Sequence, residues 1–264
     1  MTFTNPQVQF RSQPAEVSMG DDYYDLANLE HFWIKHRFNI LGRLCSKCAS
    51  DKANPKVADI GCGHGLLQCQ LEQRYGWHVE GFDLNIEALR NSVAINHSVS
   101  FYDINECHAD LASLYDFIFL FDVIEHLPDE SRFLQSVKYH LNRSGLLVVN
   151  VPANQWLYSR YDSAAGHYRR YTWRTLRQLL QREGFTPISY SYWGLTYIPL
   201  IMARKIMLAL RPLMSDSDII TAGFKSPSGL ANQVFSSLSY IDPIPNRFVG
   251  SSLMAVFAAD PNRD

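Results

Sequence analysis

Three glycines at alternate positions follow a short apolar segment near the first quarter of the chain. They are Gly61, Gly63 and Gly65, and Asp59 stands two residues before the first of them. Glycine lets a backbone turn tightly and approach a bound molecule, because no Cβ atom intervenes. The spacing differs from the G-x-G-x-x-G of dinucleotide-binding loops. The Asp59 carboxylate would be poorly placed beside a pyrophosphate but well placed beside a cation.

Two more acidic residues stand where the next apolar segments end. Asp83 lies at the predicted end of the second strand, and Asp103 lies at the predicted end of the third. A carboxylate at such a strand end can accept hydrogen bonds from both hydroxyls of a ribose. Together with the glycine loop, the two carboxylates favour a nucleoside-containing ligand. The alternative is a tight strand-to-helix turn that binds nothing.

Residues able to accept a proton follow the fourth and fifth predicted strands. His126 comes just after the fourth strand, and His167 and Tyr168 come after the fifth, in a segment rich in His, Tyr and Arg. Such side chains suit a substrate with a hydroxyl group or partial negative charge. They could also act as a base if that substrate must lose a proton before it reacts. We interpret all three as candidate catalytic residues. The alternatives are a structural role for His126 and a solvated basic helix start for the segment 165–172.

Apolar strands and amphipathic helices alternate along the chain and would position these residues. The predicted strands are 57–60, 79–82, 99–102, 117–121, 146–151, 187–193 and 253–258. The predicted helices between them are 66–75, 86–96, one that begins near Pro128 and one that Thr172 caps. This alternation predicts βαβ units and a doubly wound, mostly parallel α/β sheet. Ligands bind such sheets at the carboxyl ends of the strands.

Composition limits the partners of the protein. The chain has 264 residues, 47% of them hydrophobic, and a formal net charge of -2. That much apolar surface supports a packed core, and a near-neutral charge disfavours a nucleic-acid partner. We therefore expect a small-molecule acceptor, apolar or anionic in character, and no nucleic acid.

The cysteines and the hydropathy pattern predict the compartment. Five cysteines are an odd number, which fits reduced thiols of a cytoplasmic protein. Cys45 and Cys48 have the spacing of a metal or redox pair, but no second pair completes a zinc set, so we expect no metal site. No signal peptide or transmembrane segment is recognised, because prolines interrupt the longest charge-free stretch, 184–203. Contact with a membrane surface stays open.

Taken together, the motifs resemble those of class I S-adenosylmethionine-dependent methyltransferases, in order and spacing, over about residues 57–185. They are Asp59-Ile-Gly61-Cys-Gly63-His-Gly65, Gly81-Phe-Asp83-Leu84, Phe101-Tyr-Asp103 and Phe121-Asp-Val-Ile-Glu125-His126-Leu. The resemblance implies a Rossmann-like methyltransferase fold with seven strands, the last of them antiparallel. It also implies S-adenosyl-L-methionine as the cofactor.

The resemblance assigns a role to each cofactor-binding residue. The glycines of the loop line the methionine part, and Asp59 stands at its edge. Asp83, followed by Leu84, holds the ribose hydroxyls. Asp103 faces the adenine amino group, and Ile104 packs on the ring. Phe121 and Asp122 flank the sulfonium.

A predicted helix near the N-terminus resembles the one that closes over the cofactor in small-molecule methyltransferases. It carries Trp33 and Arg37. By this resemblance Arg37 is a candidate partner of the methionine carboxylate, and an ordinary surface arginine is the alternative.

More than fifty residues separate the last two predicted strands, and a segment that long in a compact domain is usually functional or structured. Within it, residues 200–210 form a predicted helix that is apolar nearly all round. We predict a helical lid over an apolar, lipid-like acceptor. A helix packed on the domain or a dimer interface, and attachment to a membrane surface, are the alternatives.

The sequence thus predicts one domain over residues 1–264. Its parts are an N-terminal helix at 21–49, a core at 57–193, the insertion at 194–250 and the last strand at 251–259. The predicted function is methyl transfer from S-adenosylmethionine to a small-molecule or lipid-like acceptor. A catalytically silent partner subunit with the same fold and an NAD(P)-dependent oxidoreductase are the alternatives.

Overall fold

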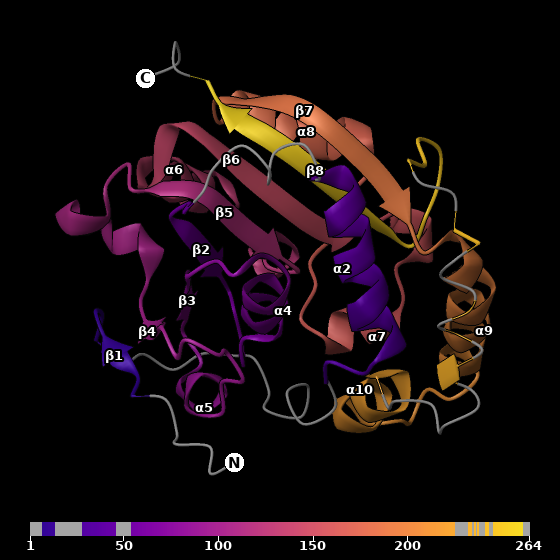
Figure 1. The fold of residues 1–264 in the computed structure, drawn as a ribbon. Helices are drawn as coiled ribbons and strands as arrows, with labels where there is room; N and C mark the ends of the chain where they lie inside the picture. The colour runs from indigo at the N-terminus through magenta and orange to yellow at the C-terminus, as the bar shows by residue number, and fades with distance from the viewer. Residues whose placement is uncertain are drawn as a thin grey trace.

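The computed structural model of the chain describes residues 7–13, 28–45, 54–224, 232–233, 235, 237, 241–242 and 245–260. Within these residues an eight-stranded sheet lies between layers of helices (Figure 1). The strands are β1 Gln9–Phe10, β2 Val57–Ile60, β3 Val79–Asp83, β4 Val99–Phe101, β5 Tyr115–Phe121, β6 Leu141–Pro152, β7 Phe185–Trp193 and β8 Ser252–Ala259. The helices are α2 Phe32–Leu44, α4 Leu66–Tyr75, α5 Ile86–Arg90, α6 Ser131–His140, α7 Arg160–Ala164, α8 Trp173–Arg182, α9 Ile198–Ala209 and α10 Asp216–Phe224.

The strand order confirms the predicted doubly wound sheet. It runs β1-β4-β3-β2-β5-β6-β8-β7. The pairs from β1 to β6 are parallel, and β8 is antiparallel to both β6 and β7. All seven predicted strands are present. The short edge strand β1 makes an eighth, which the sequence pattern did not predict.

Side chains of the central strands point alternately into two apolar layers. In β5, Phe117 and Phe119 pack with α2 and α4, whereas Ile118 and Leu120 pack with α6 and α8. Figure 1 shows α2 in front of the sheet and α8 behind it. Burial on both faces explains why this strand is apolar at every position.

Two predicted helices differ in length from the observed ones. The helix predicted at 86–96 ends at Arg90, because the backbone beyond it turns away to bond other groups. There the N–H of Val93 donates to the carbonyl of His64, and the N–H of Ile95 donates to the Glu72 carboxylate at 2.6 Å. Of the helix predicted at 21–49, α2 is observed. Residues 28–31 form a turn instead, because the His31 side chain caps the helix by accepting the N–H of Trp33 at 3.2 Å. Residues 21–27 and 46–49 lie outside the described part of the chain.

The described part of the insertion contains α9 and α10, which pack against α7 (Figure 1). Tyr161 of α7, Leu208 of α9 and Ile219 of α10 form one buried cluster. Arg160 adds hydrogen bonds from its guanidinium to the carbonyls of Leu208, Arg211 and Met214. The insertion therefore packs on and hydrogen-bonds to α7, the helix that precedes His167.

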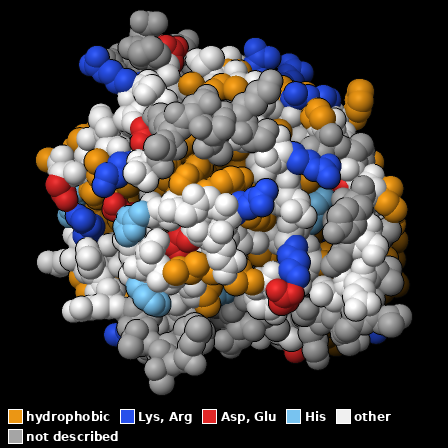
Figure 2. Space-filling model, viewed as in Figure 1, with side chains coloured by type: hydrophobic (Ala, Val, Ile, Leu, Met, Phe, Trp, Pro, Cys, Tyr) orange, Lys and Arg blue, Asp and Glu red, His pale blue; other side chains and the backbone are white. Residues whose placement is uncertain are grey.

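The lengths of the helices and the distribution of basic side chains on the surface concern two kinds of partner, membranes and nucleic acids. Among the residues described, no helix is both long and apolar enough to cross a membrane. On the face drawn in Figure 2, Lys and Arg side chains are scattered among apolar and uncharged ones and do not gather into one basic stripe. The absence of a nucleic-acid partner stays a prediction.

Candidate active site

The glycine loop lies between the end of β2 and the start of α4 in a backbone conformation that favours glycine. Gly61, Gly63 and Gly65 have φ values of 75°, 54° and 77°. A Cβ atom on Gly61 would lie 2.5 Å from Cγ2 of Val123, in the turn after β5. A side chain at Gly61 is excluded by the close approach of these two turns and by the positive φ. We call this loop, with Asp59 and the strand ends at Asp83 and Asp103, the cofactor side.

Asp83 ends β3 and faces the glycine loop. Its Oδ2 accepts a hydrogen bond from the N–H of Gly63 at 2.7 Å, and its Oδ1 accepts one from the N–H of Asn85 at 2.8 Å. Burial raises the pKa of Asp83, and these backbone donors oppose that rise. Each carboxylate oxygen keeps a second lone pair. The side chain can therefore accept two further hydrogen bonds, as a ribose diol requires. Leu84 packs beside it in a small apolar cluster.

Asp103 and Ile104 lie where the chain leaves β4. Oδ1 of Asp103 accepts hydrogen bonds from both the N–H and the Nδ2 of Asn105, each at 2.9 Å. The N–H of Asp103 donates to Oγ of Ser12 at 2.9 Å, and Ile104 is buried. The N-terminal segment that contains β1 therefore holds this end of the predicted adenine pocket in place.

Asp59 is almost fully buried at 2% exposure. Burial raises the pKa of Asp59 to about 7, helped by the negative charge of Asp83 and opposed by the guanidinium of Arg37. A carboxyl group in this state ionises readily when a cation arrives beside it.

Arg37 projects from α2 toward the end of β5. Its Nη1 donates to Oδ2 of Asp122 at 2.7 Å, and its guanidinium lies 5.1 Å from the centre of the Phe121 ring. Only 7% of Arg37 is exposed, and its Nε has no hydrogen-bond partner among the described residues. The alternative of an ordinary surface arginine is therefore wrong. Arg37 is buried, and its Nε can still donate a hydrogen bond to a ligand.

Asn150 and Trp193 connect α2 to the strand ends. Asn150 donates from Nδ2 to Oδ1 of Asp122 at 2.8 Å and accepts from Nε1 of Trp193 at 2.9 Å. The ring of Trp33 lies 4.5 Å from that of Trp193. Asn150 was not predicted as a site residue, although a lone amide within the apolar run of β6 was the available signal.

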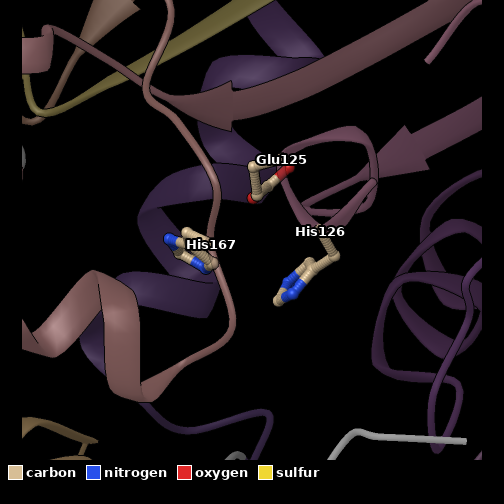
Figure 3. A group of neighbouring side chains, drawn as sticks. All are labelled: Glu125, His126 and His167. Atoms are coloured by element: carbon tan, nitrogen blue, oxygen red, sulfur yellow. The ribbon is translucent and has the colours of Figure 1, made fainter. Parts of the chain in front are cut away.

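Glu125, His126 and His167 come together beyond the end of β5, and we call this region the acceptor side. Figure 3 shows Glu125 and His126 on the turn after β5 and His167 on the loop that follows α7. One potential ligand atom from each of the three lies within 4.8 Å of the others. The two imidazole rings meet edge to face, with their centres 4.8 Å apart. Two predicted residues and one unpredicted residue, Glu125, thus form one cluster.

The charge states of this cluster follow from its burial. Burial, together with the neighbouring His167, lowers the pKa of His126 to about 4. Burial raises the pKa of Glu125 well above its usual range, and the nearby Asp122 carboxylate adds to the rise. Glu125 is 0% exposed, and neither of its carboxylate oxygens has a hydrogen-bond partner among the described residues.

Asp162 and Arg170 hold His167 in place. Asp162 is fully buried, and its Oδ1 lies 2.7 Å from both Nε and Nη2 of Arg170. Nδ1 of His167 lies 3.3 Å from the same oxygen. Burial alone would raise the pKa of Asp162, but the hydrogen bond from His167 and the charge of Arg170 lower it to about 2. With Nδ1 directed at Asp162, the other ring nitrogen of His167 is left for a ligand.

Tyr168 occupies a position that does not favour its predicted catalytic role. Its side chain is 57% exposed and lies under the guanidinium of Arg169, which is 5.8 Å from the ring centre. Its backbone N–H donates to the carbonyl of Glu125 at 2.8 Å. Tyr168 therefore supports the cluster through its main chain while its ring faces outward.

Comparison with known proteins indicates the family to which the chain is similar. A family model described as a methyltransferase domain matches residues 33–190. A ubiquinone biosynthesis O-methyltransferase of Bartonella quintana is 32% identical over 111 residues, which are 39% of this chain and 43% of that relative. The chain therefore spans less than half of this relative. A probable S-adenosylmethionine-dependent methyltransferase of Mycobacterium tuberculosis is 27% identical over 70% of this chain and 67% of its own length.

Among solved structures, the fold is similar to that of phosphoethanolamine N-methyltransferase 2 from Haemonchus contortus in complex with S-adenosyl-L-methionine. The TM-score is 0.58 at 17% identity, over 90% of this chain and 57% of that chain. At this identity the likeness concerns the fold alone.

Proposed function

Because the chain belongs to the methyltransferase domain family, we propose that it methylates a hydroxyl oxygen of a small, partly apolar acceptor. Family membership makes the protein an S-adenosylmethionine-dependent methyltransferase, in preference to the NAD(P)-dependent oxidoreductase or the silent subunit. The cofactor supplies a methyl group already activated on its sulfonium. The protein must mainly align the acceptor with that methyl group and exclude water, and alignment is worth roughly 7–11 kcal/mol.

The residues of the cofactor side fit S-adenosylmethionine. Gly61 is exposed and carries no Cβ, so its backbone is accessible to a ligand. The free lone pairs of Asp83 suit the ribose diol, and the unpartnered Nε of Arg37 suits the methionine carboxylate. Asp59 would balance a positive charge on the cofactor. These roles agree with those that the family resemblance implies.

Transfer to oxygen is supported chiefly by the Glu125–His126–His167 cluster. A hydroxyl group must lose its proton before or while its oxygen attacks the methyl carbon, so the site needs groups that promote deprotonation. Two imidazoles and a carboxyl group are gathered beside Asp122, at the strand end where the predicted sulfonium site lies. The relative from Bartonella quintana is itself named an O-methyltransferase.

The insertion supports an acceptor with an apolar part. We propose that α9 and α10 cover the acceptor, because they pack on α7, which carries Asp162 and leads directly to His167. Met207 and Met214 lie at that contact. Methionine side chains adapt to irregular apolar surfaces.

Transfer of tritium from S-adenosyl-[methyl-³H]methionine tests the proposal. The probes are a panel of phenols, catechols and aliphatic alcohols, each paired with its methyl ether, and a matching panel of amines. We expect label in at least one hydroxyl compound and none in its ether. Label confined to amines would overturn transfer to oxygen.

A pair of histidine variants locates the reaction. His167→Asn should lower turnover of that hydroxyl compound by about 10²–10⁴-fold, the usual contribution of proton transfer. His108→Asn is the matched control, because His108 also contacts a carboxylate, Glu106 at 3.0 Å, but lies away from the cluster on the surface. Equal losses in both variants would remove His167 from the acceptor side.

A further inference from the structure

Glu125 is an unusual residue for a protein interior. Its side chain is 0% exposed, yet neither carboxylate oxygen meets a hydrogen-bond donor among the described residues. A buried polar group without a partner costs free energy, and a buried charge without a partner costs far more. Such a group in a native site calls for a ligand or an ion.

Two other acids near Glu125, the partly exposed Asp122 and the buried Asp162, are already paired with cations. Asp122 is bonded to Arg37 at 2.7 Å, and Asp162 is bonded to Arg170 at 2.7 Å. Glu125 is the third carboxylate of this group and has no ion pair within the described part of the chain. A bound cation would favour the ionised form of Glu125 and balance the charge of that form.

The neighbours of Glu125 have the chemistry of metal ligands. His126 and His167 each offer a ring nitrogen, and the ligand atoms of the three residues lie within 4.8 Å of one another (Figure 3). Nδ1 of His167 is directed at the buried Asp162 carboxylate. Metal-ligating histidines are typically oriented by such a carboxylate through their second nitrogen.

We propose that Glu125, His126 and His167 bind a divalent transition-metal cation, with zinc as the best match to two imidazoles and one carboxylate. Ligand atoms on a tetrahedral zinc lie about 3.3 Å apart, so the three side chains would draw together on binding. Three protein ligands leave one coordination position open. The sequence predicted no metal site, because the only spacing it offered was that of the cysteines.

The open coordination position would allow the cation to bind the acceptor oxygen. This part of the inference rests on the proposed function. An acceptor oxygen bound there would have its hydroxyl pKa lowered, as metals lower the pKa of bound water. The proton would leave to solvent, and the oxygen's electron pair would form the bond to the methyl carbon. The S–CH3 bond would break with its electron pair left on sulfur, so that S-adenosylhomocysteine would be the leaving group.

Metal titration of the full chain, free of purification tags and stripped with a chelator, tests the site. Cobalt(II) is the first probe, because its visible spectrum distinguishes nitrogen and oxygen ligands from cysteine thiolates. We expect one equivalent to bind with a nitrogen-and-oxygen spectrum and zinc to displace it. Absence of binding, or a thiolate spectrum, would overturn the proposal.

Variants assign the ligands. Glu125→Gln and His167→Asn should each weaken zinc affinity at least about tenfold, while His108→Asn leaves it unchanged. Unchanged affinity for S-adenosylmethionine in the same variants would show that they fold. Zinc affinity equal to that of the wild type in Glu125→Gln would overturn the proposal.

Activity separates this inference from the proposed function. If the chain binds zinc at these residues but labels no hydroxyl compound, the metal site stands and transfer to oxygen fails. If hydroxyl compounds are labelled at an unchanged rate after chelation, transfer to oxygen stands and a metal role in it fails.

Discussion

On the cofactor side, Asp83 is satisfied by backbone donors, whereas on the acceptor side Asp162 depends mainly on charged side chains. Asp83 takes its hydrogen bonds from the N–H groups of Gly63 and Asn85. Asp162 takes one backbone N–H, from Ser159 at Oδ2, but its Oδ1 depends on the side chains of Arg170 and His167. Glu125 has no hydrogen-bond partner among the described residues.

This difference indicates how each side is expected to respond to change. Backbone donors belong to strand ends and turns that the sheet itself positions, so the cofactor side is preorganised by the fold. The acceptor side joins the turn after β5, α7 with its following loop, and the insertion. It buries charges that are costly when unpaired. We therefore expect substitutions there to disturb stability or turnover while they leave cofactor affinity intact.

The largest effect is expected where a buried ion pair on the acceptor side is broken. Arg170→Met would leave the Asp162 carboxylate without its cation, which typically costs about 3–5 kcal/mol of unfolding free energy. Chemical denaturation measures the loss. Arg90→Met is the control, because the Arg90–Glu87 pair is exposed and such pairs contribute only about 0–1 kcal/mol. Similar losses of unfolding free energy in both variants would contradict the expected difference between the buried and the exposed ion pair.

The contact between the insertion and α7 should carry the next largest effect. Leu208 is 1% exposed in that contact, and truncation of a buried leucine costs about 2–5 kcal/mol of packing. Leu208→Ala should therefore lower turnover of the hydroxyl probe while affinity for S-adenosylmethionine is kept. Leu213→Ala is the matched control in the same segment, with Leu213 98% exposed. Full turnover in a folded Leu208→Ala variant would contradict the proposal that α9 and α10 act as a lid over the acceptor.

On the cofactor side, Asp83→Asn removes a negative charge while it keeps the size of the side chain. Two hydrogen bonds to ribose would lose their charge-assisted strength, a loss of about 2–3 kcal/mol in total. Calorimetry should show affinity for S-adenosylmethionine weakened about 30- to 150-fold. Glu87→Gln, on the exposed face of α5, should bind normally. A Kd unchanged in Asp83→Asn would contradict the assigned ribose contact.

The smallest effect concerns pH. Because burial raises the pKa of Asp59 to about 7, this carboxyl is mostly neutral at pH 6 and mostly ionised at pH 8. The ionised form attracts a cationic cofactor, so affinity for S-adenosylmethionine should rise several-fold, and less than about tenfold per pH unit, between these values. Asp59→Asn should flatten the profile. An affinity for S-adenosylmethionine that falls as pH rises would contradict the predicted direction of this pH dependence.

The sequence predicted what local signals encode. Thr172 caps α8 as expected, α4 spans the predicted residues 66–75, and the apolar runs form the central strands. The places of the glycine loop, Asp83 and Asp103 at strand ends were predicted, because apolar runs mark the strands and the loop needs positive φ values. Their contacts with the cofactor stay a prediction.

The acceptor side was predicted only in part, because its contacts join segments that are separate in the sequence. No periodicity indicates that Glu125 meets His167, or that Asp162 pairs with Arg170. Tyr168 was chosen for its residue type, whereas the direction of its ring depends on the turn that it occupies. Helix α10 was not predicted from the sequence, and α9 lacks a clear apolar stripe.

The most direct test of the separation between the two sides is a calorimetric titration of S-adenosylmethionine into Glu125→Gln. Sites that share no partner combine additively, so the Kd should stay within about twofold of the wild type. Transfer of label to the hydroxyl probe should meanwhile be lost. A loss of cofactor affinity as large as that of Asp83→Asn would show that Glu125 belongs to the cofactor side and would contradict the account.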